Sequence, residues 1–213
     1  MPKLQDHLLG RLLGQEFDGD THDSFTPSDR QSVRIVAGRI YSVKTCQIFY
    51  TTYDIQRQTD TINPWSCPDV MVIAPPSDSD NSNDLPSERY WYARVIGIYH
   101  LKVFCTHPKV PLGGNEVRRM EFLWVRWFGS EPGYRFGFRR AKLPKIGFVP
   151  ASDEYAFGFL DPRHVVRSCH LIPAFLSGRT RDLLPVTQTD ARRPRNGQTQ
   201  LEIDDWTNYY VNM

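Results

Sequence analysis

Short segments rich in β-branched and aromatic residues recur along this chain, and turn-forming residues separate them. Such residues favour extended strands, while glycine and proline favour turns. The sequence has 16 prolines and 14 glycines spread along it, which argues for many short strands. We therefore predict a mainly β protein with minor α content. The expected strands are Val33–Val36, Arg39–Val43, Cys46–Tyr53, Asp69–Ala74, Tyr90–Tyr99, Met120–Phe128, Ile146–Pro150 and Val165–Ile172.

A chain of 213 residues is long enough to bury a substantial core. Leucines at helical spacing in Lys3–Gly14 predict a short amphipathic helix that docks on its own domain. Trp206 and Tyr210 lie close to the last residue, which suggests a piece of a longer protein. The expected parts are an N-terminal helix with an acidic lead-in (1–30), an N-terminal β segment packed on the main domain (31–76), a flexible loop (77–88), the main β domain (89–184), and a polar basic linker with a truncated C-terminal strand (185–213).

Hydropathy and cysteine usage indicate an intracellular protein. No stretch approaches the roughly 20 apolar residues that span a bilayer, and the N-terminus lacks a signal-peptide pattern. We therefore expect neither secretion nor a membrane partner. Cys46, Cys67, Cys105 and Cys169 are widely spaced, without the paired spacing of a zinc or redox motif, and are interpreted as free thiols.

Residues that ligate metals or act as nucleophiles do not form a recognisable motif. His100, Cys105 and His107 are the closest approach to a metal-ligating cluster, but their spacing is poor. Cys169 and His170 are neighbours, and neighbouring side chains on a strand point to opposite faces. A nucleophile and its base need to lie within hydrogen-bond reach of each other. We expect no metal, no cofactor and no catalytic residue.

Carboxylates offer one route to catalysis. Asp54, Asp60 and Asp69 are a candidate set for holding Mg²⁺ in a divergent metal-dependent nuclease. Asp54 can equally cap a turn, and Arg57 can pair with Asp60. The chain also lacks a glycine-rich phosphate loop before a helix and a nucleophile elbow. A non-catalytic protein is the preferred interpretation.

Two groups of residues in the second half of the chain are candidates for binding. Aromatic side chains can cage a methylated ammonium group or stack on nucleic-acid bases. Alternation along Phe122–Phe128 places its rings on two faces, so core packing stays an alternative to a cage. The aromatic candidates are Tyr90, Tyr92, Trp124, Trp127 and Phe128.

The second candidate group is basic and lies in the stretch 118–145. Clustered arginine and lysine attract phosphate, although the same residues also serve as a solvated surface. This stretch supports an alternative prediction of nucleic-acid binding. Its members are Arg118, Arg119, Arg135, Arg139, Arg140, Lys142 and Lys145.

The order of several segments resembles bromo-adjacent homology (BAH) domains, which are β folds of chromatin proteins. The resemblance rests on Tyr92–Ile98, Leu123–Phe128 followed by Glu131-Pro132, and Phe159–Pro162 continuing into Val165–Pro173. It implies a BAH-like or SH3-like twisted small barrel, here with additional N-terminal strands and a short N-terminal helix. It also implies the nucleus as a setting and histones, nucleosomes or other proteins as partners.

A second resemblance extends over nearly the whole chain. Tyr50–Asp54, Asp60–Pro64, Tyr90–Arg94, Phe122–Phe128 and Ala156–Pro162 are similar to a transposon-associated protein family of mushroom-forming (basidiomycete) fungi. Neither family supplies a catalytic motif. Together they imply a non-catalytic binding module of a mobile-element-derived protein, which engages chromatin or a protein partner. Its oligomeric state is left open.

Overall fold

The computed structural model describes residues 2–17, 25–75, 90–110, 116–137, 140–184, 191 and 205–212. Its helices are α1 (Pro2–Leu13), α2 (Pro27–Gln31) and the 3-10 turns η2 (Pro162–His164) and η3 (Phe175–Ser177). Its strands are β1 (Val33–Val43), β2 (Cys46–Thr51), β3 (Arg57–Ile62), β4 (Asp69–Ile73), β5 (Tyr90–Cys105), β6 (Arg118–Ser130), β7 (Lys145–Phe148), β8 (Phe157–Leu160), β9 (Val165–Ser168), β10 (His170–Pro173), β11 (Arg179–Thr180), β12 (Asp205–Trp206) and β13 (Asn208–Asn212).

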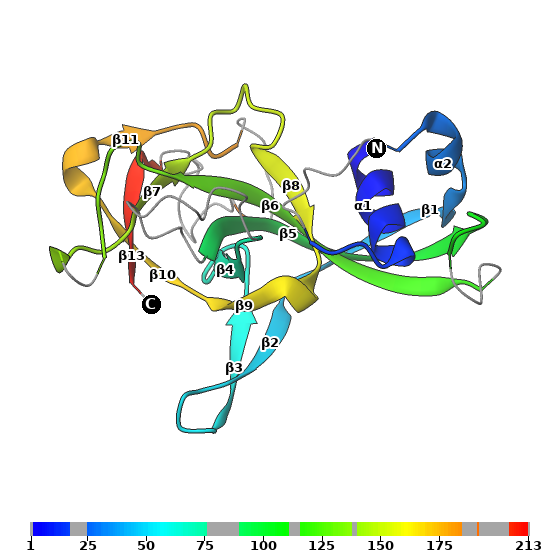
Figure 1. The fold of residues 1–213 in the computed structure, drawn as a ribbon, viewed down its shortest axis with the longest axis horizontal. Coiled ribbons are helices and arrows are strands. Elements are labelled where there is room, and N and C mark those ends of the chain that lie inside the picture. The colour runs from blue at the N-terminus through cyan, green and yellow to red at the C-terminus, as the bar shows by residue number, and fades with distance from the viewer. Residues whose placement is uncertain are drawn as a thin grey trace, which may run out of the picture.

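The predicted mainly β class is confirmed. Nine of the described strands form one antiparallel sheet in the order β10-β13-β7-β6-β5-β4-β9, with β1 added to β5 and β8 added to β6. The two end strands, β9 and β10, are separated in the chain only by Cys169, so the sheet curls back toward itself (Figure 1). Among the described strands the ladder does not close into a barrel.

The predicted N-terminal helix is α1, and its leucine stripe docks on its own domain, as expected. Leu8 and Leu9 are fully buried against Leu101 of β5 and Phe122 of β6. Figure 1 shows α1 and α2 at one end of the molecule, over the distal ends of β1, β5 and β6. The helix therefore covers a separate end of the core rather than presenting its apolar face to solvent.

The N-terminal β segment 31–76 contributes to the same sheet as the main β domain. Residues of β1 pair with β5 from Val33–Cys105 to Val43–Ile98, and β4 pairs with both β5 and β9. The predicted loop 77–88 and most of the segment 185–213 lie outside the described residues. Residues 205–212 of the latter form β12 and β13, and β13 lies between β10 and β7.

A buried arginine joins two strands of this sheet to the separate two-stranded sheet of β11 and β12. Arg94 of β5 donates to both carboxylate oxygens of Asp69 on β4, at 2.8 and 3.1 Å, and to Asp205 of β12 at 2.6 Å. Its guanidinium also lies 5.0 Å from the ring centre of Tyr209. Burial opposes charge on both partners: it raises the pKa of Asp69, whereas Asp69 and Asp205 hold the pKa of Arg94 well above its ordinary value.

Replacing Arg94 with methionine removes the cation and leaves two carboxylates beside it without their partner. Because an uncompensated buried charge is strongly unfavourable, we expect the free energy of unfolding to fall by about 3–5 kcal/mol. Urea denaturation followed by circular dichroism measures this loss. Arg119→Met is the matched control, since the Arg119–Glu121 pair is 60% and 57% exposed and a surface pair contributes less than about 1 kcal/mol. Equal losses in both variants would contradict the assignment.

The phenol of Tyr209 belongs to the same network and predicts alkaline sensitivity. Burial raises the pKa of Tyr209 to about 12, while an unfolded tyrosine titrates near pH 10. Between these values the unfolded chain loses the proton first, so stability is lost as pH rises from about 10 to about 12. We expect Tyr209→Phe to flatten that decline in thermal-melting experiments. An unchanged slope would show that other groups cause the decline.

Candidate interaction surfaces

The structure distributes the aromatic candidates among separate hydrophobic clusters. Tyr92 and Phe128 are cross-strand partners and are 4% and 7% exposed. Trp127 is 6% exposed and lies in another cluster, whereas partly buried Trp124 packs in a third. Tyr90 is partly buried against the cluster of Tyr92. These five residues therefore do not surround one opening: alternation along β6 sends Trp127 to the face opposite Trp124 and Phe128, and the latter two pack in different clusters.

The strand length of β6 divides the basic candidates into two groups. Arg118 and Arg119 begin β6, while Lys145 begins β7 beyond the other end, about 40 Å away at the rise of an extended strand. Arg119 pairs with Glu121 at 3.1 Å. Lys145 approaches Glu131 at 3.9 Å.

The remaining basic candidates belong to the connection between β6 and β7. Arg140 and Lys142 are exposed there, and Arg135 precedes them. The amine of Lys142 lies 5.9 Å from the ring centre of Tyr134. Arg139 lies outside the described residues. These residues and Arg118 and Arg119 cannot form one continuous patch across the length of β6.

The candidate nuclease carboxylates are dispersed and already engaged. Asp54 accepts a hydrogen bond from the Thr52 hydroxyl, and Asp60 accepts one from the backbone N–H of Ser168 at 2.8 Å. Asp69 is the partner of Arg94. In the part of the chain that the structure describes, no three metal-ligating side chains gather at one point.

The histidines and the cysteine of the other metal candidate also separate. His100 stacks on Tyr41 with ring centres 5.1 Å apart, while Cys105 is buried beneath α1. His107 lies 3.5 Å from the carboxylate of Asp29. The three side chains therefore contact different partners and do not converge on one point where a metal ion could bind.

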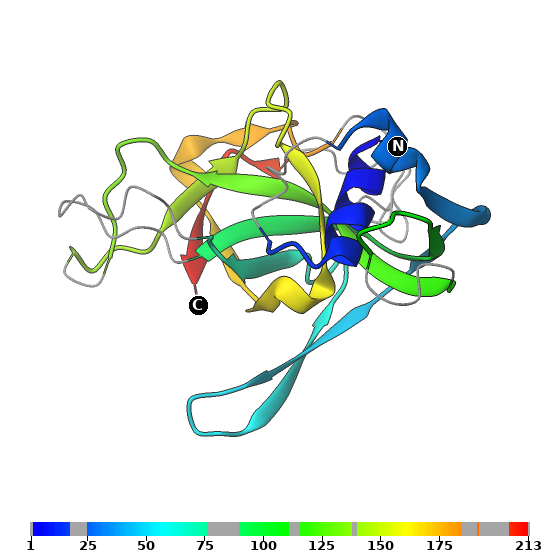
Figure 2. The same cartoon turned by 45° about the vertical axis from the view of Figure 1, so that its right-hand side comes forward.

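A different feature is an exposed apolar surface on the β2–β3 hairpin, Cys46–Ile62, which we call the arm. Figures 1 and 2 show it extending away from the curled sheet in both orientations. Ile48 and Ile62 are buried at its base in the main core. Asp60 accepts from Ser168 of β9, and Arg167 lies 5.1 Å from the ring centre of Tyr50. The base is thus fixed while the rest projects.

The far half of the arm exposes three large apolar side chains. Phe49 is 75%, Ile55 84% and Tyr53 fully exposed. Thr52 closes the turn, because its N–H donates to the carbonyl of Gln56 at 2.9 Å and its carbonyl accepts from the N–H of Ile55 at 2.9 Å. Ile55 has φ of 64°, a left-handed conformation that is costly for a β-branched residue. The turn is therefore closed by two backbone hydrogen bonds and strained at Ile55.

The sequence indicates this exposed surface only through the polar partner strand, because the alternation in Cys46–Tyr53 predicts a half-buried strand. Cys46–Tyr53 has the pattern of a half-buried strand, and Ile48 does point into the core. Its partner strand β3 is polar, however, and places Thr59 opposite Phe49. Phe49 therefore has no apolar residue opposite it, and the turn beside it carries Tyr53 and Ile55. This combination predicts an exposed apolar surface.

No helix in the described residues is long and apolar enough to cross a membrane. Comparison with protein-family models, with curated proteins and with solved structures finds no match for this chain. The resemblances to BAH domains and to the fungal transposon-associated family accordingly stay predictions from the sequence.

Proposed function

We propose that this chain is a non-catalytic module that binds a protein partner through the tip of its arm. The observation that carries the proposal is the coincidence of Phe49, Tyr53 and Ile55 on one projecting hairpin. Large apolar side chains exposed together are typical of protein-binding surfaces, and aromatic residues are enriched at the centres of interfaces. Backbone strain at an exposed turn is a second feature that accompanies functional sites.

The charge of the arm favours a protein over a nucleic acid. Between Cys46 and Ile62 there is one arginine, Arg57, against two aspartates, Asp54 and Asp60. A surface that tracks phosphates needs an excess of cations, which this hairpin does not carry. The resemblance to BAH domains makes chromatin proteins, histones included, the first partner class to examine.

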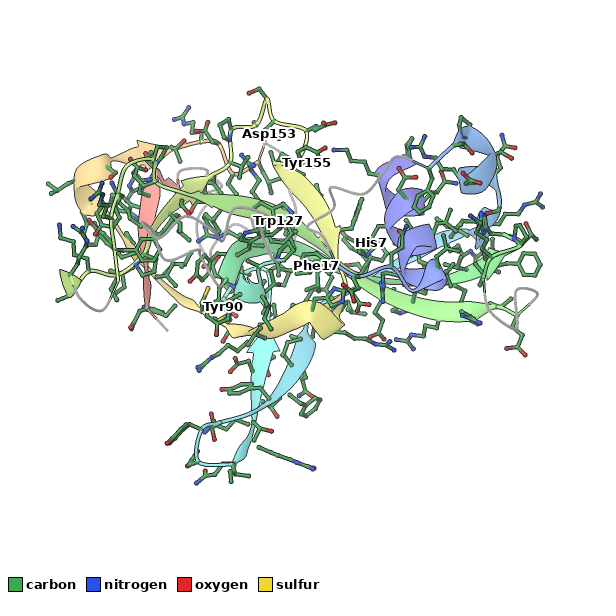
Figure 3. The ribbon with its side chains drawn as sticks, viewed as in Figure 1. His7, Phe17, Tyr90, Trp127, Asp153 and Tyr155 are labelled. Carbon is green, nitrogen blue, oxygen red and sulfur yellow. The ribbon has the colours of Figure 1, made fainter. Side chains whose placement is uncertain are left out.

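Photocrosslinking from the tip tests this proposal. We would replace Tyr53 with p-benzoylphenylalanine in the full chain and irradiate it with nuclear extract and, separately, with purified core histones. We expect discrete protein adducts whose yield falls strongly when Ile55→Asn is added, since loss of an interface anchor reduces affinity by about thirtyfold or more. The control places the crosslinker at Tyr155, which is 43% exposed and lies away from the arm (Figure 3).

Two outcomes would contradict the proposal. Identical adduct patterns from positions 53 and 155 would show that the tip has no selectivity. Adducts that disappear after nuclease treatment of the extract would indicate that nucleic acid mediates the contact, in favour of the basic residues rather than the arm. In that case affinity should also fall steeply with salt.

The strain at Ile55 makes a separate prediction about stability. Glycine adopts positive φ without steric penalty, and Ile55 loses few contacts because it is 84% exposed. We therefore expect Ile55→Gly to raise the free energy of unfolding by about 1 kcal/mol while reducing partner binding. Ile73→Gly is the control: this isoleucine is 66% exposed on β4, and glycine should destabilise an ordinary strand. Destabilisation by Ile55→Gly would rule out strain.

A further inference from the structure

Two tryptophans of the sheet form a corner, called the aromatic corner below. Trp91 of β5 and Trp127 of β6 have ring centres 6.1 Å apart and planes inclined at 78°. The backbone of Trp127 is fixed on both sides, because its N–H donates to Ala156 at 3.0 Å and its carbonyl accepts from Val149 at 3.1 Å. The walls of the corner thus belong to the rigid sheet.

The corner is occupied by a side chain from outside the sheet. Phe17 lies 6.4 Å from both Trp91 and Trp127 between ring centres, edge-on to the first and tilted to the second. The ring centre of His164 of η2 lies 4.9 Å from that of Phe17. Figure 3 shows Phe17 and Trp127 close together where the N-terminal segment crosses the sheet. One apolar ring is therefore held by three aromatic neighbours.

Phe17 is separable from the helix that precedes it. The leucines of α1 pack in a different cluster from Phe17 and the corner. Arg11 fixes the end of α1 through a 2.6 Å ion pair with Asp161 and a 2.6 Å hydrogen bond to the carbonyl of Glu121. The helix therefore has its own attachments, and Phe17 follows it on a segment without regular structure.

Phe17 has acidic neighbours in the chain, and His164 of the corner has a basic neighbour. Phe17 stands between Glu16 and Asp18 in the chain. Arg163, which is exposed, adjoins His164 at the corner, whereas the carboxylate of Asp161 is engaged by Arg11. An aromatic side chain with acidic neighbours in the chain thus packs on aromatic walls, next to a 3-10 turn that carries an exposed arginine.

We propose that the aromatic corner binds an aromatic side chain of a partner peptide in which acidic residues flank that side chain, and that Phe17 occupies the corner as a competitor in cis. The apparent Kd for the partner is then the intrinsic Kd divided by the fraction of molecules in which Phe17 has left the corner empty. This site is distinct from the exposed tip of the arm, although the base of the arm shares its hydrophobic cluster.

The test uses the full chain with Phe17→Ala and an acetylated peptide of the sequence Gly14–Asp20. Binding is followed by calorimetry and by the indole N–H signals of Trp91 and Trp127 in NMR spectra. We expect saturable binding that shifts both signals, and affinity at least about tenfold weaker in the wild-type chain, where Phe17 competes. A peptide with alanine in place of its phenylalanine, or with lysines in place of its acids, should bind much more weakly.

Adding Trp91→Ala to the Phe17→Ala chain should abolish peptide binding, whereas Trp65→Ala, at a tryptophan that is 53% exposed, should preserve it. Absence of binding to Phe17→Ala would overturn the proposal. Equal affinity in the wild-type chain would do the same, because no competition would then exist. Loss of the folded circular dichroism spectrum on Phe17→Ala would also overturn it, since a displaceable occupant cannot be required for folding.

Discussion

The antiparallel pairing of β5 and β6 is the constraint on which the rest of this structure depends. Their register runs from Tyr92–Phe128 to Val103–Arg118, with one irregularity between Val95 and Gly97. Each of the four hydrophobic clusters of the described chain takes residues from both strands. One long twisted ribbon therefore supplies a wall to the helix-covered end, to the curled sheet and to the aromatic corner. A slip of one residue in its register would move the buried side chains of the shifted strand to the opposite face.

Buried arginines explain why an arginine-rich sequence does not produce one basic surface. Arg94 is held between carboxylates, and Arg126 of β6 is fully buried. Arg126 donates to the carbonyls of Ala156 at 2.9 Å and Val149 at 2.6 Å, and its guanidinium lies 4.6 Å from the ring centre of Phe157. Planar guanidinium groups suit such sites because they satisfy several acceptors while stacking on rings. Part of the positive charge is thus used to join strands.

The sequence predicted local structure well and spatial grouping poorly. The leucine periodicity placed α1 within one residue of its observed bounds, and the apolar run Asp69–Ala74 contains β4. The aromatic candidates failed to converge because strand alternation leaves open which neighbour covers each face. Trp127 illustrates this, since its contact with Phe17 joins positions 110 residues apart in sequence. Likewise, Phe49 is exposed because the β2–β3 hairpin projects beyond the sheet. How far it projects depends on contacts between segments that are distant in sequence.

The arm owes its order to its base rather than to its own strands. An isolated two-stranded hairpin is marginally stable in water, so the far half requires the anchor provided by buried Ile48 and Ile62 and by the contact of Asp60 with β9. That anchor is attached to β4, which β5 holds through Arg94 and Asp69. The base consequently holds the strained turn away from the sheet, where its side chains are exposed. A surface ordered in advance loses less conformational entropy on binding, which lets a tip of few side chains contribute to affinity.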